Sequence, residues 1–340
     1  MSSPTPTVAA LVAGIANRER RSLARAITLI ESSRPDHREQ AEAILDAVAD
    51  SRAATIRLGI SGSPGVGKST FIEAFGLHLV ARGLSVAVLA IDPSSTRTGG
   101  SILGDKTRMM ELARSPEAFI RPSPSRGSLG GVARRTRETM ALCEAFGFDV
   151  VLVETVGVGQ SETAVADMVD LFLLLVAPGG GDDLQGIKRG IMELADLVVV
   201  NKADGELANA AGRTAADYRN ALQLMRPKFG DWSAEVLTCS AAEQTGIAEV
   251  WEAIERFRHA LEKSGELLAH RRDQAAAAMW ANVTDTLTDR FRAHRAVREL
   301  APHLEIEVAA HRLTPSRAAR QLLDAFSIAA PATDAAGDRA

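Results

Sequence analysis

Nine consecutive residues, Gly62-Ser63-Pro64-Gly65-Val66-Gly67-Lys68-Ser69-Thr70, decide the fold of this 340-residue chain. They match the pattern G-x-x-x-x-G-K-[ST] and lie between an apolar run, residues 56–60, and a stretch with helical character. Glycines let backbone N–H groups approach an anion closely, and the N-terminus of the following helix adds partial positive charge. We therefore predict a nucleotide phosphate loop, in which Lys68 reaches the β- and γ-phosphates and the Ser69 hydroxyl binds Mg²⁺.

Short apolar runs continue along the chain and predict the sheet that carries this loop. They lie at residues 56–60, 86–91, 150–153, 171–176, 197–200 and 236–238, separated by amphipathic stretches. Continuous apolar strands that alternate with helices are typical of an α/β fold whose mainly parallel sheet is covered on both faces. Polar signature residues directly follow these runs, where open α/β sheets bind ligands. The predicted fold is a P-loop NTPase G domain.

Helical extensions are expected on both sides of this domain. Residues 1–54 form the first, with a helix that runs to Pro35 and a second helix over residues 38–48. Apolar residues recur there at helical spacing: Leu11, Ile15, Leu23, Ala26, Ile27 and Ile30. The G domain is expected over residues 55–260, and a helical region over 261–328. The helices there are predicted at 247–309 and 311–326, and residues 329–340 form a small, polar, fraying tail.

A second motif, Asn201-Lys202-Ala203-Asp204, favours guanine as the base. An Asp carboxylate only accepts hydrogen bonds, and guanine offers its N1–H and its amino group side by side, so Asp204 accepts from both. Adenine has an acceptor at N1, and a site built on such hydrogen bonds rejects it. Asn201 is expected to bind the N7 edge, and the stem of Lys202 to lie along the base. Ser240-Ala241-Ala242, after the last apolar run, resembles the loop that closes over the base in GTPases; a turn that leads into a helix is the alternative.

A third motif, Glu154-Thr155-Val156-Gly157, follows the apolar run at 150–153. We expect Glu154 to act on Mg²⁺ through a bound water, and the Gly157 N–H to contact the γ-phosphate. Residues 158–162, Val-Gly-Gln-Ser-Glu, are expected to form a switch segment.

Other charged residues near the strand ends are weaker candidates. Asp92 and Asp105 are candidate Mg²⁺ ligands and catalytic carboxylates, since Mg²⁺ prefers oxygen ligands; each is otherwise a turn or helix-capping residue. Arg108 is a candidate transition-state arginine or a surface ion pair. The glycine-rich segment 178–188, which ends in the cation Lys188, is expected to be a third switch or a flexible loop.

Composition narrows the function class. The formal net charge is −4 and no long basic run occurs, which disfavours a nucleic-acid role. Cys143 and Cys239 match no metal-ligand spacing and predict ordinary thiols in a reducing compartment. Residues 1–11 lack a signal-peptide pattern, and no apolar run is long enough to span a bilayer, so a soluble cytoplasmic protein is expected.

Together, segments 62–70, 91–95, 99–109, 154–162, 178–188 and 201–204 resemble the methylmalonyl-CoA mutase-associated GTPase family, some members of which carry older names as arginine/ornithine transport ATPases or kinases. The resemblance implies a GTPase that binds GTP, GDP and Mg²⁺, chaperones a cobalamin-dependent acyl-CoA mutase, and forms a homodimer through its C-terminal helices. The residue after Ser240-Ala241 is Ala242, where the family more often has Leu.

Three other functions compete with this one. A nickel-insertion GTPase needs Cys or His ligands near the switches, and neither a cysteine nor a pair of histidines is suitably placed in the sequence. An ATP-dependent kinase conflicts with the guanine edge of Asn201 and Asp204. A nucleotide-gated binding module that does not hydrolyse GTP shares all of these motifs and stays open.

Overall fold

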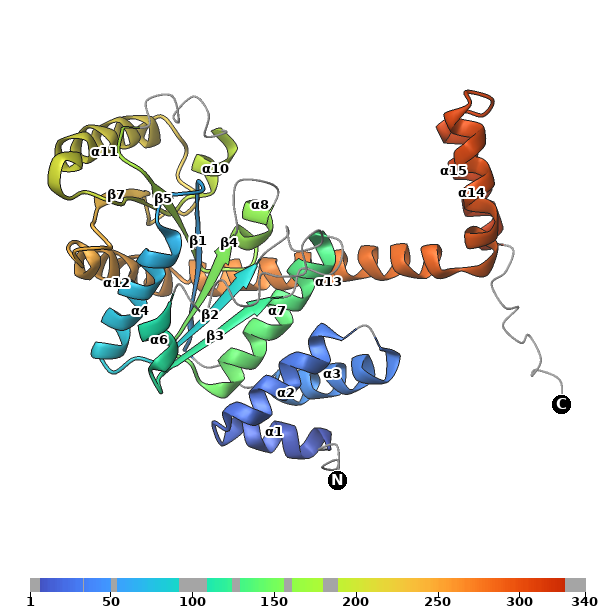
Figure 1. The fold of residues 1–340 in the computed structure, drawn as a ribbon, viewed down its shortest axis with the longest axis horizontal. Coiled ribbons are helices and arrows are strands. Elements are labelled where there is room, and N and C mark those ends of the chain that lie inside the picture. The colour runs from blue at the N-terminus through green and yellow to red at the C-terminus, as the bar shows by residue number, and fades with distance from the viewer. Residues whose placement is uncertain are drawn as a thin grey trace. The chain divides into compact units, whose positions relative to one another are not determined.

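The computed structural model describes residues 7–32, 34–49, 54–91, 109–123, 129–155, 161–179 and 189–327. Within them a sheet has seven strands in the order β3-β2-β4-β1-β5-β6-β7, and each described pairing is parallel (Figure 1). The strands are β1 (Ile56–Gly62), β2 (Val86–Ile91), β3 (Ala118–Ser123), β4 (Val150–Thr155), β5 (Leu171–Val176), β6 (Leu197–Val200) and β7 (Glu235–Thr238). The predicted α/β fold class is confirmed.

Helices cover both faces of this sheet (Figure 1). Along β5, Leu171, Leu173 and Leu175 pack in one core with residues of α4 and α12, and Phe172 packs in another with residues of α7 and α8. The described helices are α1 (Val8–Ala16), α2 (Arg20–Glu31), α3 (Pro35–Val48), α4 (Lys68–Ala81), α6 (Met110–Arg114), α7 (Leu129–Phe146), α8 (Ser161–Ala166), α10 (Arg189–Leu194), α11 (Ala208–Gln223), α12 (Ile247–Ser264), α13 (Glu266–Ala293), α14 (Arg295–Ala309) and α15 (Pro315–Ser327), with a 3₁₀ turn η3 (Gly205–Leu207).

The N-terminal helices α1–α3 pack on α7, and the apolar residues that recur at helical spacing in the sequence are buried there. Two polar contacts reinforce this packing: Arg18 donates to the Gly147 carbonyl (2.8 Å), and Arg121 on β3 pairs with Glu31. The structure differs from the predicted single helix before Pro35. The chain breaks between α1 and α2, where Arg18 adopts a left-handed backbone conformation (φ 57°).

Two further differences concern strand and helix boundaries. The edge strand β3 was not predicted, and the long helical stretch predicted at 247–309 is divided into three helices. Gly265, at φ 80°, ends α12 in a left-handed conformation that favours glycine, and His294 lies between α13 and α14.

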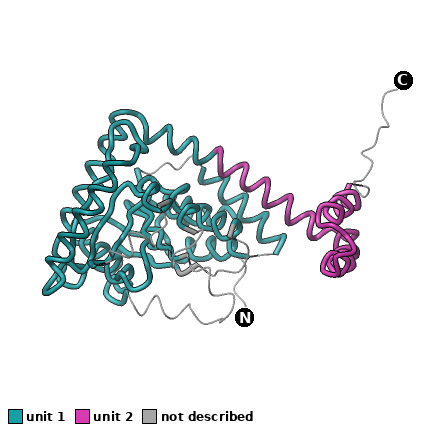
Figure 2. The backbone as a smooth tube through the Cα atoms, turned by 90° about the horizontal axis from the view of Figure 1, so that it is seen from above, with its two compact units in different colours: residues 1–275 teal, residues 276–340 magenta. Residues whose placement is uncertain are grey.

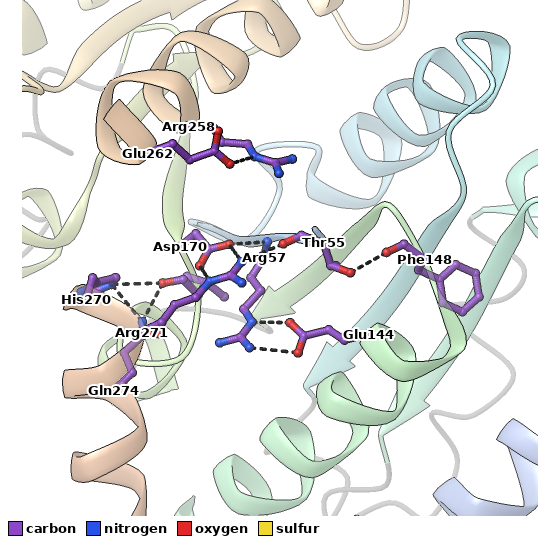
Figure 3. A network of polar contacts seen from close by, with 11 residues as sticks. Thr55, Arg57, Glu144, Phe148, Asp170, Arg258, Glu262, His270, Arg271 and Gln274 are labelled. Carbon is purple, nitrogen blue, oxygen red and sulfur yellow. Dashed lines mark hydrogen bonds and ion pairs between the residues drawn. The ribbon is translucent and has the colours of Figure 1, made fainter. Parts of the chain in front are cut away.

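The first turns of α13 are fixed to the amino edge of the sheet by a buried polar network (Figure 3). Arg271 donates to both carboxylate oxygens of Asp170, at 2.7 and 2.6 Å, and to the Thr55 carbonyl at 2.7 Å. Asp170 also accepts from the Arg57 backbone N–H (2.9 Å), and Gln274 donates to the Val169 carbonyl (2.7 Å). A two-pronged arginine–carboxylate pair of this kind sets position as well as adding binding energy.

The chain divides into two compact units, residues 1–275 and 276–340, within α13 (Figure 2). The second unit holds the rest of α13 with α14 and α15, where the ring of Phe326 packs edge-on against Phe291 and His294. None of the helices in the described ranges combines the length and the apolar character needed to cross a membrane.

Candidate nucleotide site

The phosphate loop joins the carboxyl end of β1 to the start of α4, beside the strands β4 and β5. Gly65 and Gly67 have φ values of 82° and 92°, which favour glycine. A side chain at Gly62 would place its Cβ 2.4 Å from the Leu175 carbonyl oxygen, and one at Gly67 would meet the Asn201 amide nitrogen at 2.8 Å. The glycines therefore serve both the backbone conformation of the loop and its close contact with the neighbouring strands.

Lys68 is the first residue of α4, and its side chain turns back over the loop. Its Nζ donates to the Gly62 carbonyl (2.7 Å) and to the Ser63 carbonyl (3.4 Å). Burial lowers the pKa of Lys68, while the nearby carboxylates of Glu154 and Glu162 raise it. The ammonium therefore lies at the anion-binding end of α4, partly shielded from water.

Ser69 and Glu154 meet at this edge of the sheet. The pairing of β1 with β4 sets Ile60 opposite Glu154, and the Ser69 hydroxyl donates to the buried Glu154 carboxylate at 3.5 Å. A hydroxyl and a carboxylate are oxygen ligands of the kind that Mg²⁺ takes. Ser69 and Glu154 therefore fit the Mg²⁺ site expected from the sequence.

A buried contact that the sequence analysis did not identify involves the next residue along β4, Thr155. The Thr155 hydroxyl donates to the Ser61 hydroxyl (2.8 Å), and both side chains are fully buried. The contact joins Ser61, near the carboxyl end of β1, to Thr155, the residue after Glu154 on β4, and so links the two strands at this edge of the sheet. The sequence feature that could have revealed this contact is a hydroxyl residue at the end of each of these two apolar runs.

Asn201, at the end of β6, links three parts of the site. Its Nδ2 donates to the Val66 carbonyl of the phosphate loop (2.9 Å), and its Oδ1 accepts from the Ala241 backbone N–H (3.0 Å) and the Cys239 thiol (3.5 Å). Burial raises the pKa of Cys239 to about 12, so its thiol keeps its proton. Because an amide NH₂ group carries two hydrogens, the second donor of Asn201 remains for the N7 edge of a base.

Lys202 and Asp204 complete the edge that the sequence analysis assigns to the base. Lys202 has a left-handed backbone (φ 59°), and its Nζ donates to the Gly65 carbonyl at 2.7 Å, so its stem spans the loop. Asp204 accepts from the buried Ser240 hydroxyl, which in turn accepts from the Glu243 backbone N–H (3.1 Å). A carboxylate held at one oxygen by Ser240 retains acceptor sites on both oxygens for two guanine donors.

Several predicted site residues lie outside the described residues: Asp92, Asp105, Arg108, Gly157 and Lys188. The described residues 62–70, 154, 201–204 and 240–242 are brought together at one edge of the sheet by β1, β4, β6 and the segment after β7. Their donors and acceptors are complementary to a guanine nucleotide: amides and an ammonium for the phosphates, an amide and a carboxylate for the base.

A parallel sheet with this phosphate loop and this guanine edge defines a P-loop GTPase. The family model described as "Methylmalonyl Co-A mutase-associated GTPase MeaB" matches residues 23–296, and the chain belongs to that family. The family resemblance, the P-loop fold class and the assignment as a GTPase are thereby confirmed.

Relatives of known sequence and structure match nearly the whole chain. A probable GTPase of Mycobacterium bovis is 55% identical over 318 residues, 94% of this chain and 95% of that protein. The mitochondrial methylmalonic aciduria type A homolog of Mus musculus is 48% identical over 326 residues, 93% of this chain and 79% of that protein. The crystal structure of an LAO/AO transport system kinase covers 96% of this chain and 100% of its own, with a TM-score of 0.75 and 40% identity.

Proposed function

We propose that this GTPase gates the delivery of cobalamin to a methylmalonyl-CoA-type mutase and protects that enzyme. GTP binding, the first part of this proposal, is supported above all by the direct hydrogen bonds between the predicted base-binding residues and the phosphate loop. Asn201 and Lys202 both bind carbonyls of that loop, at Val66 and Gly65. The description of the family names methylmalonyl-CoA mutase, which supports a mutase of this type as the partner enzyme.

Each site residue has a proposed role in GTP hydrolysis. Residues 62–70 bind the phosphates, with Lys68 at the β- and γ-phosphates, and Asn201, Lys202, Asp204 and 240–242 bind the base. Ser69, Glu154, Asp92 and Asp105 hold Mg²⁺, and the Gly157 N–H senses the γ-phosphate. When bound, Mg²⁺ neutralises charge on the phosphate oxygens and supports the transfer to water.

The 3.5 Å contact between the Ser69 hydroxyl and the Glu154 carboxylate supports the shared metal role of these two residues, because it places both groups near the position of one cation. Lys68 holds its ammonium against the loop carbonyls and is set to exchange them for phosphate oxygens, which are stronger, charged acceptors. Residues 55–260 form the proposed GTPase domain.

The properties of the two cysteine thiols argue against the alternative function, nickel insertion. Cys143 and Cys239 are both buried, and burial raises the pKa of each thiol, to about 12 for Cys239. Metal ligation needs the thiolate, so these residues are poor metal ligands.

We expect the mutase to accelerate GTP turnover and Lys188→Ala to abolish that stimulation. The glutamine that positions water in Ras-like proteins directly follows the switch glycine, yet Val158 follows Gly157 here. A cation placed against the transferred phosphate raises the hydrolysis rate by roughly 10³–10⁵-fold. Lys188, the last residue of the candidate switch 178–188, is the cation that we propose for this role. GTP turnover of each protein, alone and with the mutase, measures the effect.

The matched control is Lys263→Ala, which removes an exposed lysine from the last turn of α12. It is expected to respond to the mutase as the wild type does, whereas Lys188→Ala keeps its basal rate and its GTP affinity. Fast hydrolysis by the wild type alone, or normal stimulation of Lys188→Ala, rules out a switch of this kind.

We also propose that residues 261–328 mediate homodimerisation. Met279, Trp280, Val283 and Leu287 lie on one side of α13 and are exposed, Trp280 by 65%. Soluble proteins seldom leave such an apolar stripe uncovered.

Trp280→Asp is therefore expected to shift the protein to a monomer in sedimentation velocity, and Asp289→Ala, on the opposite side of the same helix, to leave the dimer intact. A wild-type protein that sediments as a monomer contradicts this assembly.

A further inference from the structure

A second cavity lies at the amino ends of β6 and β7, at the opposite edge of the sheet from the nucleotide site. Its volume is about 640 Å³, within the range of about 300–1,000 Å³ that is typical of pockets for small molecules. It is lined by residues of α10 and of the end of α11, by Ala195 and Asp196, and by residues 225–229 and 232–236. None of these residues takes part in the nucleotide site.

Two charged residues of the lining, Asp196 and Lys228, form an ion pair and so largely neutralise each other. Asp196 is buried, and its carboxylate accepts from the Phe172 backbone N–H (2.9 Å) and from Lys228 Nζ (3.3 Å). Burial raises the pKa of Asp196 to about 6, against the opposing effect of Lys228. Lys228 also lies 5.0 Å from the centre of the Phe229 ring. Asp196 therefore compensates Lys228.

Two arginines of the lining are not neutralised by an ion pair of this kind. Within the described ranges, Arg219 and Arg226 have no carboxylate partner, and Arg219 makes a single long hydrogen bond there, to the Val236 carbonyl (3.4 Å). Besides Asp196 the lining holds two carboxylates, Glu193 on α10 and Glu235, of which Glu235 is bound by Arg256 at 2.7 Å. The cavity therefore offers two guanidinium groups whose donors are largely free.

Apolar surface lies beside these guanidinium groups. Trp232 is half-buried, and its ring is fixed by the Nε1–H that donates to the Asp196 carbonyl (2.9 Å) and by edge-on packing against Phe257. Leu222 and Met225 are half-buried in the same lining. A rigid aromatic ring and adaptable methionine suit a hydrocarbon or aromatic body.

We propose that this cavity binds a small organic oxyanion, with its carboxylate or phosphate on Arg219 and Arg226 and its apolar body against Trp232 and Met225. A guanidinium presents planar, paired donors that match carboxylate and phosphate oxygens in two-pronged contacts. The apolar wall supplies affinity that a bare inorganic ion would not gain. The site is independent of the proposed mutase function.

The test is calorimetric titration of the full-length protein, saturated with GDP so that the phosphate loop is occupied. Phenyl phosphate, benzoate and the neutral benzyl alcohol are the probes. At least one of the two anions is expected to bind more tightly than the alcohol. Arg219→Ala/Arg226→Ala is expected to weaken that binding by about 10–100-fold, since hydrogen bonds to charged groups are lost. Gln223→Glu, which adds a negative charge to the same lining without changing side-chain size, is expected to weaken it as well.

The matched control is Arg25→Ala/Arg38→Ala, which removes two exposed arginines of the N-terminal helices. Binding in this variant is expected to equal that of the wild type. Binding of phenyl phosphate alone identifies a phosphate ligand, and binding of benzoate alone a carboxylate ligand. Equal binding of benzyl alcohol, unchanged anion binding after loss of both Arg219 and Arg226, or no binding of any probe overturns the proposal.

Discussion

Asp204→Asn is expected to weaken GDP binding by about 10²–10⁴-fold, because two hydrogen bonds to a charged acceptor are replaced by one neutral bond and one clash of donors. The same variant is expected to bind xanthosine diphosphate more tightly than GDP. Xanthine carries an oxygen where guanine carries its amino group, so the Asn amide donates to that oxygen and accepts from N1–H. Calorimetric titration of both proteins with both nucleotides measures the exchange of specificity.

The control for this change is Glu206→Gln, which removes an exposed carboxylate two residues further along, in η3. It alters the local charge as Asp204→Asn does, and it is expected to leave GDP affinity unchanged. In Asp204→Asn the Ser240 hydroxyl still has an acceptor at this position, so the loop contact is retained. Equal affinity of the wild type for ATP and GTP, or normal GDP binding by Asp204→Asn, contradicts the assignment of the guanine edge.

The central sheet could be predicted from local patterns because its inner strands are buried on both faces. Strands β5 and β6 are uninterrupted apolar runs, all of whose residues are buried. Such runs are typical of parallel sheets. Placing the phosphate loop after one run and Asn201 after another put both motifs at the same edge, where the structure also places them.

The edge strand β3 could not be predicted in the same way. It contains Arg121 and Pro122 and has no long apolar run, because one of its sides has no partner strand among the described residues. Its charge is explained by the ion pair with Glu31, about ninety positions earlier in the chain. A contact at that sequence separation has no local signal.

The same reasoning applies to the site. Sequence motifs predict which residues bind phosphate and base, since spacing alone carries that information. They did not reveal that Asn201 joins Val66 to Ala241, or that Ser240 holds Asp204. These contacts depend on how three loops meet at the sheet edge. The anchor of α13 through Arg271 and Asp170, one hundred and one positions apart, is of the same kind.

Lys68→Ala is expected to lower kcat/KM for GTP by about 10²–10⁴-fold or more, because the ammonium group supplies charged donors to the β- and γ-phosphates in the transition state. Ser69→Ala is expected to reduce turnover strongly as well, by removing a Mg²⁺ ligand, and part of that loss is expected to be recovered at high Mg²⁺ concentration. Single-turnover hydrolysis of GTP over a range of Mg²⁺ concentrations separates these two effects.

Loss of folding is not expected to explain the result for Lys68→Ala. Burial lowers the pKa of Lys68, which means that the folded protein holds this charge at a cost, and removing it is expected to leave the melting temperature unchanged or higher. Lys68→Arg keeps the charge but presents a larger, planar group where Nζ lies 2.7 Å from the Gly62 carbonyl, and so is expected to be nearly as inactive. Hydrolysis near the wild-type rate by Lys68→Ala would show that the phosphate loop is misassigned, and full activity of Lys68→Arg would show that charge alone, without the position of the ammonium, is sufficient.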